Sequence, residues 1–192
     1  MPRVVLTARE GLRLLNHGPV VLVTSSSGRR DDVITLAWSM PASASPPMVA
    51  IAVAPKRYSH GLIRRSREFV VNVPDSRLLP AVWLCGSVSG RDADKFAAAG
   101  LTRAVAATVH APLIAECFGH LECRVARAFT AGDHTVFVGK VVHASVDPRA
   151  FDGTLRLRDG SQTLHHLGGP HFVTSGGRRL PAPLHSRTFT SE

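Results

Sequence analysis

The segment from Val33 to Met40 constrains the fold more than any other stretch of this chain. Its side chains alternate between apolar residues and small or hydroxyl-bearing ones, and a period of two predicts a β-strand with one apolar face. After Pro46-Pro47, residues 48–54 are apolar without interruption, which is typical of a strand covered on both sides. The polar face of the first strand suits a flat ligand close to the backbone, and it fits equally well with Thr35 and Ser39 facing water.

Length and composition indicate one folded domain. The chain has 192 residues, of which 44% are hydrophobic and 19% are charged, which is enough for a full core but short for two domains. We assign residues 1–177 to a single domain and residues 178–192, which contain several Pro and Arg, to a loosely ordered tail. The three cysteines are sparse, and the sequence shows neither a secretory signal nor a bilayer-spanning run. This favours a soluble, cytoplasmic protein without a membrane partner.

The charge of the chain is strongly basic but dispersed. The formal net charge is +9, which attracts anions such as nucleic acid, anionic lipid or phosphorylated cofactors. The Arg and Lys residues form no long run, and few aromatic side chains are available to stack bases, so nucleic-acid binding is the less favoured explanation. His165, His166 and His171 lack a neighbouring carboxylate or thiolate, and we predict no metal site.

The remaining segments predict strands connected by short helices. A β-hairpin is expected over residues 117–146, turning at Ala131-Gly132-Asp133. Pro80 is the weak point of one predicted helix, and a capping box of Ser89 and Asp92 begins another, which ends at Gly100. The other expected strands cover 20–25 and 68–73, and the other expected helices cover 7–16, 59–65 and 76–84. This order predicts a mainly β fold with short helices, a closed antiparallel Greek-key barrel.

Several catalytic and cofactor motifs are absent from the sequence. There is no GxGxxG dinucleotide fingerprint, no P-loop, no HExxH and no GxSxG. We therefore predict no catalytic side chain. A bound cofactor that carries its own reactive group needs from the protein only a shaped and polar binding site.

Six segments occur together along the chain: ITLAWS (34–39), Pro46-Pro47, RYSHG (57–61), EFVVNVP (68–74), CGSVSGRDADKF (85–96) and HLGGPHF (166–172). Together they resemble the flavin reductase-like family with the FMN-binding split barrel, and most closely its flavoredoxin branch. The resemblance implies a homodimer with FMN near the subunit interface. It also implies hydride or electron transfer through the flavin.

The resemblance further implies a flavin site built from three clusters and two single side chains. The ring edge and ribityl chain are assigned to Asp32, Thr35, Leu36, Ala37, Trp38 and Ser39. A phosphate anchor at a helix start is assigned to Arg57, Tyr58 and Ser59. A second anion-binding cluster is assigned to Ser87, Ser89, Arg91 and Lys95. The two single side chains that complete the site are His134 and Phe172.

Two of these assignments have alternatives in the sequence. Many relatives carry Asn where this chain has Asp32, and a carboxylate there loses a hydrogen-bond donor and adds negative charge. Lys95 is implied to contact the ligand, but an ordinary surface ion pair with Asp92 or Asp94 would also account for it.

Three functions follow, in order of preference. The first is an NAD(P)H-dependent flavin reductase that uses NADH or NADPH as co-substrate and supplies reduced flavin to a partner such as a flavin-dependent monooxygenase. The second is an FMN electron carrier of the flavoredoxin type, without NAD(P)H activity and with a redox partner. The third is a protein that binds nucleic acid or an anionic surface through its charge, and it predicts steep loss of binding with added salt.

Overall fold

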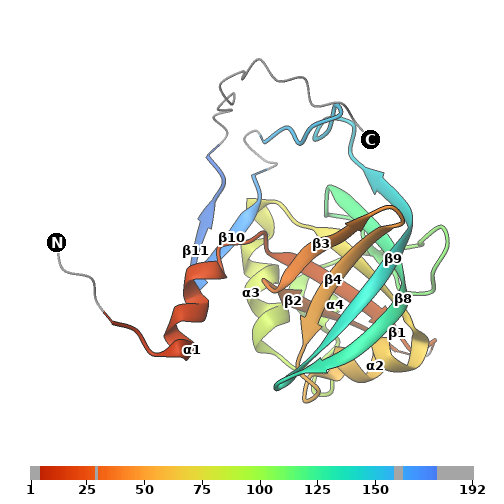
Figure 1. Cartoon of the computed structure of the whole chain (residues 1–192). Coiled ribbons are helices and arrows are strands. Elements are labelled where there is room, and N and C mark those ends of the chain that lie inside the picture. The colour runs from red at the N-terminus through yellow and green to blue at the C-terminus, as the bar shows by residue number, and fades with distance from the viewer. Residues whose placement is uncertain (1–4, 29, 158–161, 177–192) are drawn as a thin grey trace.

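The computed structural model of the chain describes residues 5–28, 30–157 and 162–176 (Figure 1). Its central element is a seven-stranded antiparallel sheet with the order β2-β1-β5-β8-β9-β4-β3. The sheet consists of β1 (Val21–Ser26), β2 (Asp31–Leu36), β3 (Ser39–Ala44), β4 (Pro47–Val53), β5 (Glu68–Val73), β8 (Gly119–Ala131) and β9 (His134–Val146). Two small sheets pair β6 (Arg103–Ala104) with β7 (Leu113–Ile114) and β10 (Leu164–Gly168) with β11 (His171–Thr174). The helices are α1 (Ala8–Gly11), η1 (Leu12–Leu15), α2 (Tyr58–Ser66), η2 (Ser76–Leu78), α3 (Leu79–Ser87) and α4 (Lys95–Ala99).

The large sheet curls into a barrel (Figure 1). Strands β2 and β3 stand at opposite ends of the strand order, yet only Ala37 and Trp38 separate them in the chain. Two residues span a few ångströms, so the two ends of the sheet must lie close together. The prediction of a mainly β, antiparallel barrel with short helices is confirmed.

The prediction of one continuous strand from Val33 to Met40 is wrong. The strand breaks at Ala37 and Trp38, where the chain passes from the β1 side of the barrel to the β4 side, and Trp38 O accepts a hydrogen bond of 3.0 Å from Ala52 N. The alternation of apolar side chains continues through the break, but the apolar positions after it are no longer buried. Ile34 is buried, whereas Trp38 and Met40, which follow the break, are 41% and 62% exposed.

Two hydrophobic cores lie on either side of β1 and β2. The barrel interior contains the side chains of Val23, Ile34, Ile51, Phe69 and Phe137. The outer face of the same two strands is covered by α3 and α4, with a core that contains Leu22, Val33, Val82, Cys85 and Phe96. Both faces of β2 are therefore covered, so its polar face does not lie open to solvent as the alternation suggested.

Close contacts inside the barrel leave no space at one glycine. A Cβ atom at Gly139 of β9 would lie 2.5 Å from Cζ of Phe69 on β5 and 3.0 Å from Cβ of Cys123 on β8. The Phe69 ring therefore occupies the volume that a side chain at position 139 would need.

The ends of the short helices differ from the sequence prediction. Pro80 lies in the first turn of α3, where a missing N–H costs nothing, so it starts this helix rather than weakening it. The capping box of Ser89 and Asp92 is wrong, because α4 begins at Lys95 and its N-cap is Asp94, which accepts from the backbone N–H groups of Phe96 and Ala97. Gly100 ends this helix in the left-handed conformation, as predicted.

The β8–β9 hairpin is confirmed, with Gly132 at φ +61° in its turn. Strands β10 and β11 were not predicted, since their segment is rich in glycine and histidine. The predicted tail, residues 178–192, lies outside the described residues. Across the described ranges, no helix is long and apolar enough to cross a membrane.

Candidate functional site

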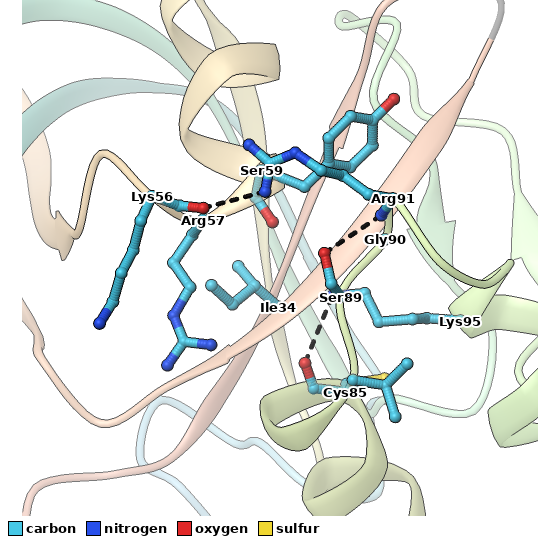
Figure 2. Close-up of a pocket in the computed structure, with 11 residues that line it drawn as sticks. Ile34, Lys56, Arg57, Ser59, Cys85, Ser89, Gly90, Arg91 and Lys95 are labelled. Atoms are coloured by element: carbon cyan, nitrogen blue, oxygen red, sulfur yellow. Dashed lines mark hydrogen bonds between the residues drawn. The ribbon is translucent and has the colours of Figure 1, made fainter.

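A hollow of about 210 Å³ opens between the start of α2 and the loop that follows α3. Figure 2 shows Lys56 and Arg57 on one side of it, Cys85, Ser89 and Lys95 on the other, and Ile34 of β2 between them. The hollow is lined by Ile34, Lys56, Arg57, Tyr58, Ser59, Cys85, Val88, Ser89, Gly90, Arg91 and Lys95.

The floor of the hollow is the Lys95 side chain, which forms a buried ion pair with Asp32 beneath it. The side chains of Asp32 and Lys95 are 2% and 3% exposed, and Lys95 Nζ lies 3.0 Å from Asp32 Oδ1. The hydroxyl of Ser59 donates to the other carboxylate oxygen, and Lys95 also donates to the carbonyl of Cys85 over 3.3 Å. These bonds join β2, the start of α2, the end of α3 and the start of α4 in one buried network.

This network leaves no space for a side chain at position 90, so a glycine is required there. A Cβ atom at position 90 would lie 2.2 Å from Asp32 Oδ1 and 2.8 Å from Tyr58 Cδ1, closer than side-chain atoms approach in folded proteins. The loop after α3 therefore passes directly over the Asp32 carboxylate only because residue 90 has no side chain.

The rim of the hollow is cationic. Lys56, Arg57 and Arg91 are exposed and line it. Arg91 donates to the carbonyl of Lys56 over 3.0 Å (Figure 2), and its guanidinium carbon lies 5.6 Å from the centre of the Tyr58 ring. The first N–H groups of a helix have no partner within the helix, so the start of α2 adds polar donors to this positive rim.

Burial makes one further group of the lining, the Cys85 thiol, unreactive. Burial raises the pKa of Cys85 to about 11, with Lys95 opposing this change and Asp32 adding to it. The thiol is therefore protonated at neutral pH and is not a nucleophile there.

The structure brings some of the sequence-predicted site residues together and separates others. Asp32 lies directly under the floor. The predicted residues that line the hollow are Arg57, Tyr58, Ser59, Ser89, Arg91 and Lys95. Those outside its lining are Thr35, Leu36, Ala37, Trp38, Ser39, Ser87, His134 and Phe172.

The residues outside the lining have other contacts. Thr35 donates to the carbonyl of Val82, which ties β2 to α3. Trp38 donates to Asn16 over 2.7 Å, and its ring centre lies 4.8 Å from that of His134. The partly buried Phe172 packs against the exposed ring of Trp83, with the ring centroids 6.3 Å apart.

Trp38 and His134 form an aromatic pair near the Lys56 side of the hollow. His134 Nδ1 donates a 2.7 Å hydrogen bond to the carboxylate of Asp133. This contact lowers the pKa of Asp133, and the charge of Lys56 lowers it further. The role of this pair in flavin binding stays a prediction.

Sequence analysis missed five lining residues: Ile34, Lys56, Cys85, Val88 and Gly90. Lys56 directly precedes the Arg57–Ser59 cluster, so its charge was a usable signal. Gly90 stands inside the CGSVSG stretch, but only the position of Asp32 in space shows why glycine is needed there.

The chain is thus an antiparallel β-barrel with a hollow whose rim carries cationic side chains. The family model for the flavin reductase like domain matches residues 13–165. The chain belongs to this family, and the resemblance deduced from the six segments is confirmed.

Similar proteins agree with this assignment. The uncharacterized protein YddH of Escherichia coli (strain K12) is 40% identical over 172 residues, which cover 86% of this chain and 91% of that protein. The FMN-binding domain of a flavin reductases-like enzyme from Shewanella baltica OS155 has a TM-score of 0.78 at 26% identity and covers 94% of this chain and 97% of its own. The flavoredoxin of Desulfovibrio vulgaris (Miyazaki F) has a TM-score of 0.80 at 22% identity, with 94% and 97% covered, which shows a shared fold.

Proposed function

We propose that the chain binds FMN with its phosphate at the hollow and transfers hydride from NADH or NADPH to the flavin. The single observation that supports this most strongly is the cationic rim at the start of α2. Three cationic side chains and the N–H groups at the start of α2 surround one hollow, and together they suit a dianionic phosphate. FMN, when bound, supplies the hydride acceptor.

The size of the hollow limits which part of FMN it can hold. A volume of about 210 Å³ is below the range of about 300–1,000 Å³ typical of small-molecule sites. The hollow therefore suits the phosphate-bearing end of the cofactor, while the ring system lies on the surface beside it. Val88 at the edge of the hollow is 37% exposed and offers an apolar contact there.

We further propose that a second copy of the chain covers the ring system. Exposed apolar side chains near α3 and β11 include Leu79, Trp83 and Val173, which are 36%, 47% and 47% exposed. Trp83 and Phe172 contact each other, so the surface is continuous between α3 and β11. Apolar surface of this kind commonly marks an interface, and a homodimer would bury it and complete a site that one chain encloses only in part.

The protein side chains need not supply a general acid or base for this reaction. Asp32, the carboxylate at the hollow, is engaged by Lys95 and Ser59, and the cations of the rim stabilise negative charge on a bound ligand. Reduced flavin can then pass to a partner oxygenase or donate electrons while bound. The partner stays a prediction.

The test is flavin loading followed by steady-state oxidation of NADH and NADPH with excess free FMN. We expect a yellow protein that takes up FMN and oxidises one or both nucleotides. The double variant Arg57→Gln/Arg91→Gln should lose FMN affinity, whereas the matched variant Arg77→Gln/Arg149→Gln, away from the hollow, should retain it. Failure of the purified protein to take up FMN would contradict the proposal.

A protein that binds FMN but does not oxidise NADH or NADPH would instead be an electron carrier. The protein would then bind FMN stoichiometrically but show no NAD(P)H consumption at any concentration of free flavin. Binding to heparin that is independent of flavin and lost with added salt would support the anionic-surface alternative.

A further inference from the structure

Because of the ion pair under the hollow, the rim and the floor of the site differ in charge. Lys56, Arg57 and Arg91 give the rim its positive charge. Lys95 lines the same hollow, but its side chain is 3% exposed and its ammonium group lies 3.0 Å from the Asp32 carboxylate. The floor is therefore close to neutral, even though a lysine faces the ligand.

Lys95 retains some capacity to bind a ligand. An ammonium group carries three N–H donors, and within the described residues Asp32 and the carbonyl of Cys85 account for two of them. The third donor is available to an acceptor in the hollow. Because Asp32 balances the charge, this donor attracts an anion less strongly than an unpaired ammonium group would.

The network also fixes the position of Asp32. One of its oxygens pairs with Lys95 and the other accepts from Ser59. The backbone at Gly90 passes so close to the carboxylate that residue 90 has no space for a side chain. The carboxylate cannot turn away from Lys95 without losing both contacts inside a buried site, which is costly. The neutralisation is therefore permanent as long as the loop after α3 is in place.

We propose that Asp32 is a specificity-determining residue that sets how strongly the site prefers a phosphorylated ligand over its uncharged counterpart. This inference rests on the proposed flavin site. By cancelling the charge of Lys95, Asp32 leaves recognition of the phosphate to the rim and holds the preference for FMN over riboflavin at a moderate level. An asparagine at position 32 keeps the shape of the side chain and uncovers the charge of Lys95.

The test compares the ratio of the riboflavin and FMN dissociation constants in the original chain and in Asp32→Asn. The two ligands differ only in the phosphate group, so changes in ring binding cancel in the ratio. Any ligand in a hollow of this size lies within a few ångströms of Lys95, and we expect Asp32→Asn to raise the preference for FMN by about tenfold. The matched control is Asp147→Asn, which makes the same change in net charge beside Arg149, away from the hollow, and should leave the ratio unchanged.

A second variant keeps the inference testable if Asp32→Asn does not fold. Asp32→Asn/Lys95→Met removes both charges, and it should return the ratio to within about threefold of the original, because the floor is again neutral. A tenfold loss of FMN preference in the double variant would show that Lys95 acts as a free cation, and it would overturn the inference. An unchanged ratio in a folded Asp32→Asn variant would do the same.

A readout without flavin separates this inference from the proposed function. Inorganic phosphate should raise the melting temperature of Asp32→Asn more than that of the original chain or of Asp147→Asn. If no variant binds flavin but this difference is present, the flavin function fails and the role of Asp32 stands. If flavin binds and neither the ratio nor the phosphate effect changes, the role of Asp32 fails and the flavin function stands.

Discussion

Two buried carboxylates, Asp32 and Glu122, are satisfied in different ways. Asp32 is 2% exposed and is held by the cationic Lys95 and by Ser59, under a hollow. Glu122 of β8 is 1% exposed and accepts hydrogen bonds from the backbone N–H groups of Ala107 and Thr108, at 2.8 and 2.7 Å, and from the Thr108 hydroxyl. Its remaining contact is His143, 3.2 Å away.

The difference separates a structural carboxylate from one that controls the charge of a site. Neutral donors fix the loop around residues 107 and 108 on the barrel, and Glu122 is not one of the residues that line the hollow. A charged partner at Asp32 costs more to desolvate, and a buried ion pair is weak evidence for stability by itself. The pair at Asp32 lies beside a hollow with a cationic rim, which is where we propose that it acts.

The largest expected effect comes from breaking the ion pair on one side. Lys95→Met leaves the Asp32 carboxylate buried without its counter-charge, and we expect a loss of about 3–5 kcal/mol in the free energy of unfolding. Urea denaturation measures it. Asp32→Asn/Lys95→Met should recover most of the loss, and a double variant as unstable as Lys95→Met would refute the pairing.

An intermediate effect is expected at the hydrogen-bonded carboxylate. Glu122→Gln keeps the shape but replaces one acceptor oxygen with a donor that faces the Ala107 or Thr108 N–H. We expect a loss of about 2 kcal/mol in the free energy of unfolding at neutral pH. FMN affinity should be unchanged, and a parallel loss of affinity would show that the two regions are coupled.

The stability loss of Glu122→Gln should also depend on pH. Burial alone would raise the pKa of Glu122, but hydrogen bonds from Thr108 and Ala107, together with His143, outweigh it and lower the pKa. A lowered pKa in the folded state stabilises the protein above the usual glutamate pKa, and this contribution is lost as the pH falls through the lowered value. The stability difference between the original chain and Glu122→Gln should therefore shrink on acidification. Urea denaturation of both proteins at several pH values measures this difference, and a stability difference that grows as the pH falls would contradict the lowered pKa of Glu122.

The smallest expected effect is at the rim. Arg57→Gln removes one exposed cation at the start of α2 without disturbing a side-chain cap, since Arg57 makes none. We expect FMN affinity to fall about fivefold at low ionic strength and less at high salt, with riboflavin affinity unchanged. Isothermal titration at two salt concentrations measures this, and an equal loss for both ligands would place Arg57 at the ring instead.

Local patterns were sufficient to predict the main strands of the barrel. The β8–β9 hairpin follows from side-chain alternation and its turn residues, and strand β5 follows from a short, mostly apolar segment closed by Pro74. These signals act between neighbours in the chain. The break at Ala37 and Trp38 could not be predicted, because the alternation continues through it. Only the closure of the barrel requires the chain to change sides there.

Long-range contacts account for what the sequence missed in the site. The pattern around Lys95 offered Asp92 and Asp94 as partners, yet Asp94 caps α4 and pairs with Arg103 over 2.9 Å. Lys95 instead pairs with Asp32, which is 63 positions earlier in the chain. No local rule predicts such a pair, and the same holds for Gly90 and its contact with Asp32.

The contact between Gly139 and Phe69 has an evolutionary consequence. Their strands are separated by β8, but the aromatic ring fills the volume that any larger residue at position 139 would need. The two positions should therefore vary together among descendants of this chain. A side chain gained at position 139 should be tolerated only where a smaller residue has replaced the phenylalanine at position 69.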